Sequence, residues 1–211
     1  SREIKLGHVG RAVNQSEVRI ANDGEILFKG PGVFCGYLNK PEQTKETLID
    51  GWLHTGDVGE MDNYGNIKIT DRKKDIIITA GGKNISPSEI ENELKFSPFV
   101  SDAVVIGDKR KFLSCLIMID EENVMKYAQD NDIPFSNFES LCKSEEVVNL
   151  IDGEVSKVNK KFASVEQVKK FSLIDIQLTA EDDELTPTMK LKRKFINQKY
   201  SNIIENMYQS A

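Results

Sequence analysis

The sequence predicts an α+β fold, in which a small antiparallel β-rich subdomain is followed by a mixed α+β domain with a short central sheet flanked by helices. Two observations lead to this prediction. The first third of the chain consists of short strand-like runs separated by turns rich in Gly, Asn and Asp, whereas the remainder combines apolar strands with amphipathic helical stretches. The composition changes at the charged run of residues 71–75, which we expect to form a turn, so we place the domain boundary there.

The β-rich part contains a hairpin signal near its start. Strand-like residues 18–20 and 25–28 flank residues 22–24, Asn-Asp-Gly, and glycine tolerates the positive φ that tight hairpin turns need. A two-turn helix is expected over residues 41–48, with Asn39 as its cap. We expect the edges of its sheet to be partly open, and this part alone offers only a thin apolar core.

The stretch after the charged run combines a strand signal, two glycines and a helix start. A β-branched run, residues 76–79, ends just before the glycine pair. The next helix has a complete start signal, because Ser86 can cap it, a proline suits its first position and Glu89 completes a capping box. Gly81 and Gly82 let the backbone approach a ligand closely, although a polar turn followed by an ordinary loop remains the alternative interpretation.

The rest of the chain supplies the apolar segments of a core. Strands at residues 100–106 and 113–119 flank a polar turn, and Asp120 caps a helix after the second strand. A last strand is expected over residues 171–176, and a final helix is expected to begin at Thr188. A stripe at helical spacing between these segments is expected to be core rather than a ligand site. The stripe consists of Val147, Ile151, Val155, Val158 and Phe162.

Composition and charge exclude one broad class of function. With 39% hydrophobic and 29% charged residues among 211, the chain is an ordinary globular sequence. A net charge of −6 argues against a general nucleic-acid binder, which needs a basic face, so we expect no nucleic-acid partner. One basic cluster near the C-terminus is the local exception. It comprises Lys190, Lys192, Arg193, Lys194 and Lys199.

Cysteine usage and apolar runs indicate the compartment. Three cysteines are an odd number and show no metal-like spacing, so we expect no disulfides, no metal site and a cytoplasmic location. No apolar run approaches the roughly 18 residues of a membrane span, and no signal peptide opens the sequence. We expect the start at Ser1 to be a cut within a longer protein.

Four stretches of the sequence are informative through their order and spacing. They are Gly24 to Trp52, Leu53 to Asp57 (LHTGD), Asp71 to Gly82, and Leu185 to Arg193 (LTPTMKLKR). Together they resemble the adenylate-forming ligases, the family that includes the acyl-CoA synthetases, and the resemblance covers essentially the whole chain. It implies that residues 1–71 are the last β-rich subdomain of a large N-terminal adenylation domain, that residues 72–75 are a hinge, and that residues 76–211 are a mobile C-terminal domain.

The resemblance also implies a chemistry and four residues that serve its first step. A carboxylate attacks the α-phosphate of ATP to give an acyl-adenylate and pyrophosphate, and the thiol of coenzyme A then displaces AMP. Asp57 is expected to accept both ribose hydroxyls, Arg72 to donate to the ribose or phosphate side, and Ile69 to pack on the nucleotide. Lys190 is expected to neutralise charge at the α-phosphate. Each residue also has an ordinary alternative role. Asp57 would be a turn aspartate and Arg72 a member of a surface ion pair. Ile69 would be a core residue and Lys190 a solvated lysine.

Three further residues are assigned to the second step. Lys74 falls on the hinge position of the family, where the C-terminal domain rotates between adenylation and thioester formation. After this rotation, the loop with Gly81 and Gly82 is expected to face the active site, where its backbone can approach the pantetheine arm of coenzyme A.

Departures from the family pattern narrow the interpretation. Met189 stands where many relatives have a glycine, and this form resembles the long-chain and bubblegum-type acyl-CoA synthetases. The phosphate loop, the magnesium-binding glutamate and the fatty-acid tunnel of the family would lie before Ser1. We therefore expect ATP, coenzyme A and a fatty acid as substrates, Mg²⁺ with its ligand outside this chain, the missing N-terminal domain as a partner, and no activity for the fragment alone.

Two alternatives stay open at this stage. An acyl-AMP ligase or a carrier-protein adenylation enzyme shares the first half-reaction but transfers the acyl group to another acceptor. In the second alternative the chain is a non-catalytic binding module, whose lysine-rich helix docks a partner or makes a peripheral contact with an anionic membrane.

Overall fold

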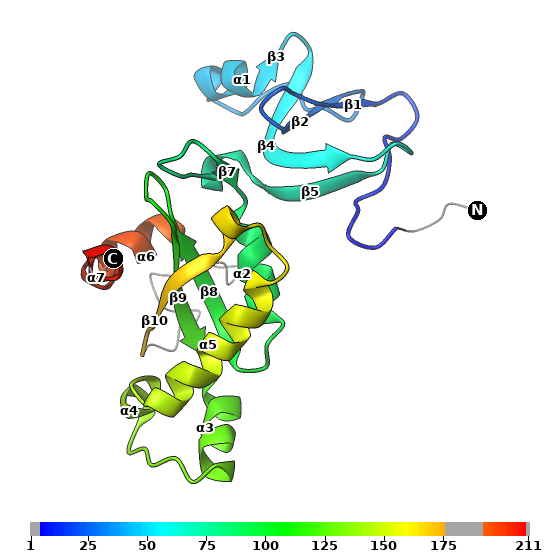
Figure 1. Cartoon of the computed structure of the whole chain (residues 1–211). Coiled ribbons are helices and arrows are strands. Elements are labelled where there is room, and N and C mark those ends of the chain that lie inside the picture. The colour runs from blue at the N-terminus through cyan, green and yellow to red at the C-terminus, as the bar shows by residue number, and fades with distance from the viewer. Residues whose placement is uncertain (1–4, 176–191, 210–211) are drawn as a thin grey trace. The chain divides into compact units, whose positions relative to one another are not determined.

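The computed structural model describes residues 5–175 and 192–209. The chain divides into two compact units, residues 1–76 (unit 1) and residues 77–211 (unit 2). Figure 1 labels most of the helices and strands of both units.

Unit 1 is built on a five-stranded antiparallel sheet. Its strand order is β1-β2-β4-β3, and β5 pairs with Asp57 to Met61 at the end of β4. The strands are β1 (Glu17–Ile20), β2 (Glu25–Lys29), β3 (Leu48–Ile49), β4 (Trp52–Met61) and β5 (Ile67–Arg72). The β1–β2 hairpin confirms the turn signal, because Gly24 has a φ of +85° that glycine adopts without strain.

A β-bulge sets the register between β4 and β5. The pairing of Gly59 with Ile69 changes to that of Val58 with Asp71, so Thr70 is skipped. Because successive side chains of a strand point to opposite faces, this one-residue shift determines that Arg72 lies opposite Asp57. Gly59 is required at this point, since a Cβ there would lie 2.2 Å from the carbonyl oxygen of Lys68.

Local features of unit 1 differ from the sequence expectations at two points. The helix α1 (Pro41–Thr47) is present, but Lys40 rather than Asn39 is its N-cap, and Asn39 has a positive φ of 55°. The charged run does not form one turn. Asp71 and Arg72 complete β5, and only the next three residues form the 3₁₀ turn η1 (Lys73–Asp75).

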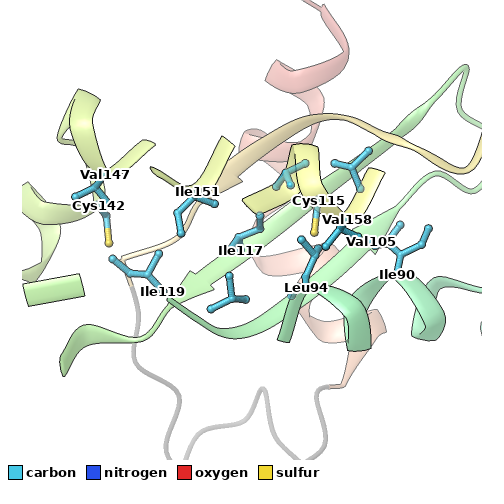
Figure 2. Packing of buried hydrophobic residues seen from close by; sticks show 14 of the residues in the cluster. Ile90, Leu94, Val105, Cys115, Ile117, Ile119, Cys142, Val147, Ile151 and Val158 are labelled. Atoms are coloured by element: carbon cyan, nitrogen blue, oxygen red, sulfur yellow. The ribbon is translucent and has the colours of Figure 1, made fainter. Parts of the chain in front are cut away.

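Unit 2 has a three-stranded sheet with helices on both faces. The order is β10-β9-β8, where β8 (Val100–Ile106) and β9 (Leu113–Ile119) are antiparallel and β10 (Val168–Leu173) runs parallel to β9. On one face, alternate residues of β9 join α2 (Pro87–Lys95) and α5 (Glu145–Asn159) in a single apolar cluster. Figure 2 shows Ile151 and Val158 of α5 packed with Ile117 and Cys115 of the sheet.

The other face of this sheet is covered by the two C-terminal helices. Leu116 and Met118 of β9 lie in one cluster with Ile196 of α6 (Arg193–Lys199) and Met207 of α7 (Ser201–Gln209). All seven residues of β9 are therefore buried. Two smaller helices, α3 (Glu121–Asp130) and α4 (Phe138–Cys142), contribute residues to the first cluster, and the 3₁₀ turn η2 (Ser164–Glu166) precedes β10.

Most expected elements of unit 2 are confirmed, but some boundaries are wrong. The strands at 100–106 and 113–119 have the expected bounds, and Asp120 caps α3 by accepting a hydrogen bond from the amide of Asn123. The last strand begins at Val168 instead of residue 171, because its pairing with β9 extends to that residue. The expected final helix is two helices in the described part, and Thr188 lies outside the described residues.

The segment before α2 is less regular than its β-branched sequence suggests. Only Ile77–Ile78 form a strand, β6, which pairs with β7 (Asn84–Ile85). Ser86 is the N-cap of α2 and a proline follows it, but the Ser86 side chain makes no capping hydrogen bond, so the expected capping box is wrong. The helix is held instead by burial of its apolar face, including the fully buried Leu94.

Candidate nucleotide site

One face of the unit 1 sheet forms an apolar pocket of about 310 Å³. Alternate residues of each strand supply its wall, since side chains two apart point to the same face. Asp57 and Ile69, two of the expected nucleotide-binding residues, both line this pocket. The remaining lining residues are Val9, Gly10, Arg11, Ala12, Val13, Val18, Ile26, Phe28, Leu53, Thr55 and Ile67.

Asp57 and Arg72 form an ion pair at the edge of this pocket. Arg72 Nε lies 2.7 Å from Asp57 Oδ1, and the two residues are directly paired across β4 and β5. The Asp57 side chain is 25% exposed and the Arg72 side chain 60% exposed. An ionised carboxylate offers about four lone-pair sites, so one bond to Arg72 leaves capacity for two hydroxyl donors. The structure thus brings Asp57, Arg72 and Ile69 together on adjacent strands.

A buried carboxylate, Glu25, lies next to this pair and was not singled out from the sequence. Its side chain is only 5% exposed. Glu25 Oε1 accepts a hydrogen bond of 2.9 Å from the amide of Gly56. Its other oxygen, Oε2, lies 3.0 Å from His54 Nδ1 and 2.9 Å from Lys73 Nζ. The sequence signal that could have revealed it is a glutamate directly after a turn, at the head of the apolar run of β2.

The partners of Glu25 keep it ionised. Burial by itself would raise the pKa of the Glu25 carboxyl, but hydrogen bonds from Lys73, His54 and the Gly56 amide outweigh burial and lower the pKa below its usual value. Hydrogen bonds to Asp23 and Glu25 in turn raise the pKa of Lys73. This part of the sheet therefore holds a persistent charge cluster.

The expected hinge residue and the expected loop glycines are exposed. Lys74 lies in η1, and the chain divides into its two units after residue 76. Gly82 has a φ of +77°, and its amide donates to the carbonyl of Thr79, which closes a tight turn. A Cβ at Gly82 would meet no atom within 4 Å, so glycine is required there by backbone conformation and not by crowding within the chain.

Lys190 lies outside the described residues, but the segment that follows it is anchored. Arg193 Nη1 donates to the carbonyl of Val105 at 2.9 Å, and its Nη2 lies 2.8 Å from Glu91 Oε1. Glu91 also accepts from the Val105 amide at 2.7 Å.

The buried thiols are unsuited to nucleophilic chemistry. Desolvation raises the pKa of Cys115 well above its usual value, and burial raises that of Cys142 to about 12. All three cysteines are free, and Cys35 is the exposed one.

The described residues contain neither a metal-binding cluster nor a membrane-spanning helix. No group of three His, Cys, Asp or Glu side chains in residues 5–175 and 192–209 is placed to hold a metal ion. No helix within the same ranges has the length and apolar character needed to cross a bilayer.

Comparison with known families and sequences gives a consistent result. The family described as "AMP-binding enzyme C-terminal domain" matches residues 74–211. The long-chain-fatty-acid–CoA ligase FadD15 of Mycobacterium tuberculosis is 40% identical over 207 residues, which cover 98% of this chain and 34% of that protein. The chain thus spans about a third of the length of this curated relative.

Solved structures agree with the fold. The o-succinylbenzoate-CoA synthetase of Bacillus subtilis in complex with AMP is 28% identical, with a TM-score of 0.64 over 90% of this chain and 35% of that chain. The adenylation domain of a carboxylate reductase from Mycobacterium chelonae has a TM-score of 0.75 at 23% identity, covering 94% of this chain and 31% of that chain. The second similarity concerns the fold alone.

Proposed function

Because the chain belongs to the AMP-binding enzyme family, we propose that it is part of a long-chain fatty acid–CoA ligase, which forms acyl-CoA from a fatty acid, ATP and coenzyme A. The observation that carries the proposal is the similarity over nearly the whole chain to a protein of that name. The pairing of Asp57 with Arg72 beside an apolar pocket supports it, because a nucleoside needs hydrogen-bond acceptors and donors next to an apolar surface.

The reaction has two steps. The fatty-acid carboxylate oxygen attacks the α-phosphorus of ATP, and the bond to the β-phosphate oxygen breaks, which releases pyrophosphate and leaves the acyl-adenylate. The thiol of coenzyme A then attacks the acyl carbonyl, loses its proton, and expels AMP. Both steps gain from fixed charges near the transferring groups.

The residues of this chain serve these steps as follows. Asp57 accepts hydrogen bonds from the ribose hydroxyls, Arg72 orients Asp57 and donates toward the ribose or phosphate, and Ile69 packs on the nucleotide. Lys190 neutralises the charge that develops on the α-phosphate and the carboxylate. Each role stays a prediction.

The second step would use the hinge and the loop of unit 2 that contains Gly81 and Gly82. Lys74 is proposed as the hinge about which residues 76–211 rotate, and Gly81 and Gly82 as the part of the loop that lies along the pantetheine arm. The described residues contain no group of three His, Cys, Asp or Glu side chains placed to hold a metal ion, and the ligand for Mg²⁺ is proposed to lie outside this chain. We place the protein in the cytoplasm, in line with its free cysteines, and leave a peripheral membrane contact as a secondary proposal.

The test uses the full-length protein that contains this chain. Pyrophosphate release and acyl-CoA formation would be measured with fatty acids of graded length. Lys190→Ala should lower pyrophosphate release by about a hundredfold, because it removes a charge that acts on the transition state. The matched control is Lys194→Ala, which removes an exposed lysine of α6 and should leave the rate within about twofold.

The outcomes separate the alternatives. Adenylate formation without a CoA thioester would favour an acyl-AMP ligase or a carrier-protein adenylation enzyme. No adenylate with any acid would contradict both enzyme proposals and favour a binding module. For that module, Lys190→Ala and Lys194→Ala should weaken binding of a partner to a similar extent.

A further inference from the structure

Glu25 occupies an unusual position for a carboxylate. It is the first residue of β2, and it is followed by the buried Ile26 and Leu27. A buried charge is costly unless it is paired and hydrogen-bonded. Both Glu25 oxygens have partners. Oε1 accepts from the Gly56 amide, and Oε2 contacts the His54 ring nitrogen and the Lys73 ammonium.

The contacts of Glu25 reach both members of the Asp57–Arg72 pair through their chain neighbours. Gly56, whose amide bonds Glu25, is the residue before Asp57. Lys73, whose ammonium bonds Glu25, is the residue after Arg72. One buried carboxylate therefore links β4 and the end of β5 at the place where these two residues face each other.

A second tie supports the β4 side of this arrangement. Thr55 Oγ1 donates to the carbonyl of Ile26 at 2.6 Å and accepts from the amide of Asp57 at 3.1 Å. Residues 55–57 are thus bonded to the first two residues of β2. The Thr55 hydroxyl bonds the Ile26 carbonyl, and the Gly56 amide bonds the Glu25 carboxylate. The backbone of Asp57 has little freedom as long as Glu25 holds the Gly56 amide.

We infer that Glu25 is a positioning residue of the nucleotide site, which holds Asp57 and Arg72 in register and fixes the chain on the N-terminal side of the hinge at Lys74. This inference rests on the proposed nucleotide role of Asp57 and Arg72. Glu25 is not among the residues that line the pocket. It acts through the Gly56 amide and the Lys73 ammonium.

The hinge part of the inference follows from Lys73. Its ammonium contacts Glu25 at 2.9 Å and Asp23 at 2.7 Å, although the side chain is 46% exposed. Lys74 follows at once and is exposed. Because two carboxylates anchor Lys73 and the next residue is exposed, a backbone rotation is confined to the positions after Lys73.

The competing explanation is that Glu25 only stabilises unit 1. A matched control for it is Asp62, another carboxylate that organises this sheet. Asp62 accepts hydrogen bonds from the amides of Tyr64 and Asn66 and from the Asn66 side chain, and it pairs with Lys5. It lies in the β4–β5 turn, far along both strands from Asp57 and Arg72.

The experiment compares Glu25→Gln, Lys73→Met and Asp62→Asn with the wild type in the full-length protein. Melting temperature, AMP affinity by calorimetry, and KM for ATP and for the fatty acid would be measured for each. Glu25→Gln should raise the KM for ATP and the dissociation constant for AMP by about tenfold, with an unchanged KM for the fatty acid. Lys73→Met should shift the same two constants in the same direction by about threefold.

Asp62→Asn should lower the melting temperature and leave both nucleotide constants within about twofold. The inference is overturned if Glu25→Gln lowers the melting temperature but not the nucleotide affinity, or if Asp62→Asn weakens nucleotide binding equally. If Glu25→Gln does not fold, Lys73→Met decides by the same criteria. A wild type that binds AMP but forms no adenylate contradicts the proposed function alone, whereas one that binds neither ATP nor AMP contradicts both proposals.

Discussion

The central strands of the two units are buried to very different degrees. In unit 2, all seven residues of β9 are buried between two apolar clusters. In unit 1, the ten-residue strand β4 buries only Val58 and Gly59. Unit 2 is thus stabilised mainly by apolar burial, and unit 1 owes more to polar ties such as those of Glu25.

This difference explains where the candidate site lies. A strand covered on both faces has no surface left for a ligand, whereas a sheet with one open face can present polar residues at the edge of an apolar pocket. Most of the exposed large hydrophobic residues also belong to unit 1. The same polar contacts that hold unit 1 together surround Asp57 and Arg72, so stability and site geometry are linked there.

The largest expected effect concerns the apolar core of unit 2. Ile151→Ala removes a fully buried side chain of α5 and should lower the free energy of unfolding by about 2–5 kcal/mol. Circular dichroism in urea would follow unit 2, which contains every described α-helix except α1, and fluorescence of the single tryptophan, Trp52, would follow unit 1. A shift of the Trp52 transition by the same amount would show that the two units unfold together.

A smaller effect is expected where unit 2 uses a polar tie. Arg193→Met removes the bonds to Glu91 and to the Val105 carbonyl and should destabilise the docking of α6 by about 1.5–3 kcal/mol. Hydrogen exchange of the α6 amides should become faster. Lys194→Met, on the exposed side of the same helix, is the control, and equal exchange rates in both variants would contradict the prediction.

The third prediction tests the polar character of unit 1 through pH. Because the pKa of Glu25 is lowered in the folded state, its contribution to stability is present above the ordinary glutamate pKa of 4.5 and is lost as the pH falls through the folded pKa. The difference in unfolding free energy between the wild type and Glu25→Gln should be constant above pH 4.5 and shrink below it. Urea titrations followed by Trp52 fluorescence would measure it, and a pH-independent difference would refute it.

The smallest expected effect is at an exposed ion pair of unit 1. Lys45 and Glu42 are 3.0 Å apart, with side chains 72% and 80% exposed. Lys45→Met should change the Trp52-reported stability by less than about 0.5 kcal/mol, since solvent screens such pairs. A larger change would mean that surface charges also contribute to unit 1.

Local signals allowed much of the fold to be predicted. The β1–β2 hairpin follows from Asn-Asp-Gly, and the cap at Asp120 marks the start of α3. The two strands with continuous apolar runs have their expected bounds. These features depend on residues within a few positions of one another, so their energetics are visible in a single stretch of sequence.

The candidate site was predicted only as separate residues. Asp57, Ile69 and Arg72 were named from motifs, but their meeting depends on the skipped residue Thr70, which sets the register of β5. Glu25 and Lys73, 48 positions apart, gave no sequence signal of their contact. Lys190 remains a prediction.

The sequence by itself determined the α+β class and the position of most helices and strands, because capping, turn chemistry and hydrophobic periodicity are short-range effects. The candidate site residues were named from the resemblance of four stretches to a known family. Tertiary structure decided the parallel pairing of β10 with β9, the bulge that places Arg72 opposite Asp57, and the burial of Glu25 among its three partners. Each of these depends on contacts between distant segments. Their free energy is gained only when the strands meet, and no local stretch of the chain encodes it.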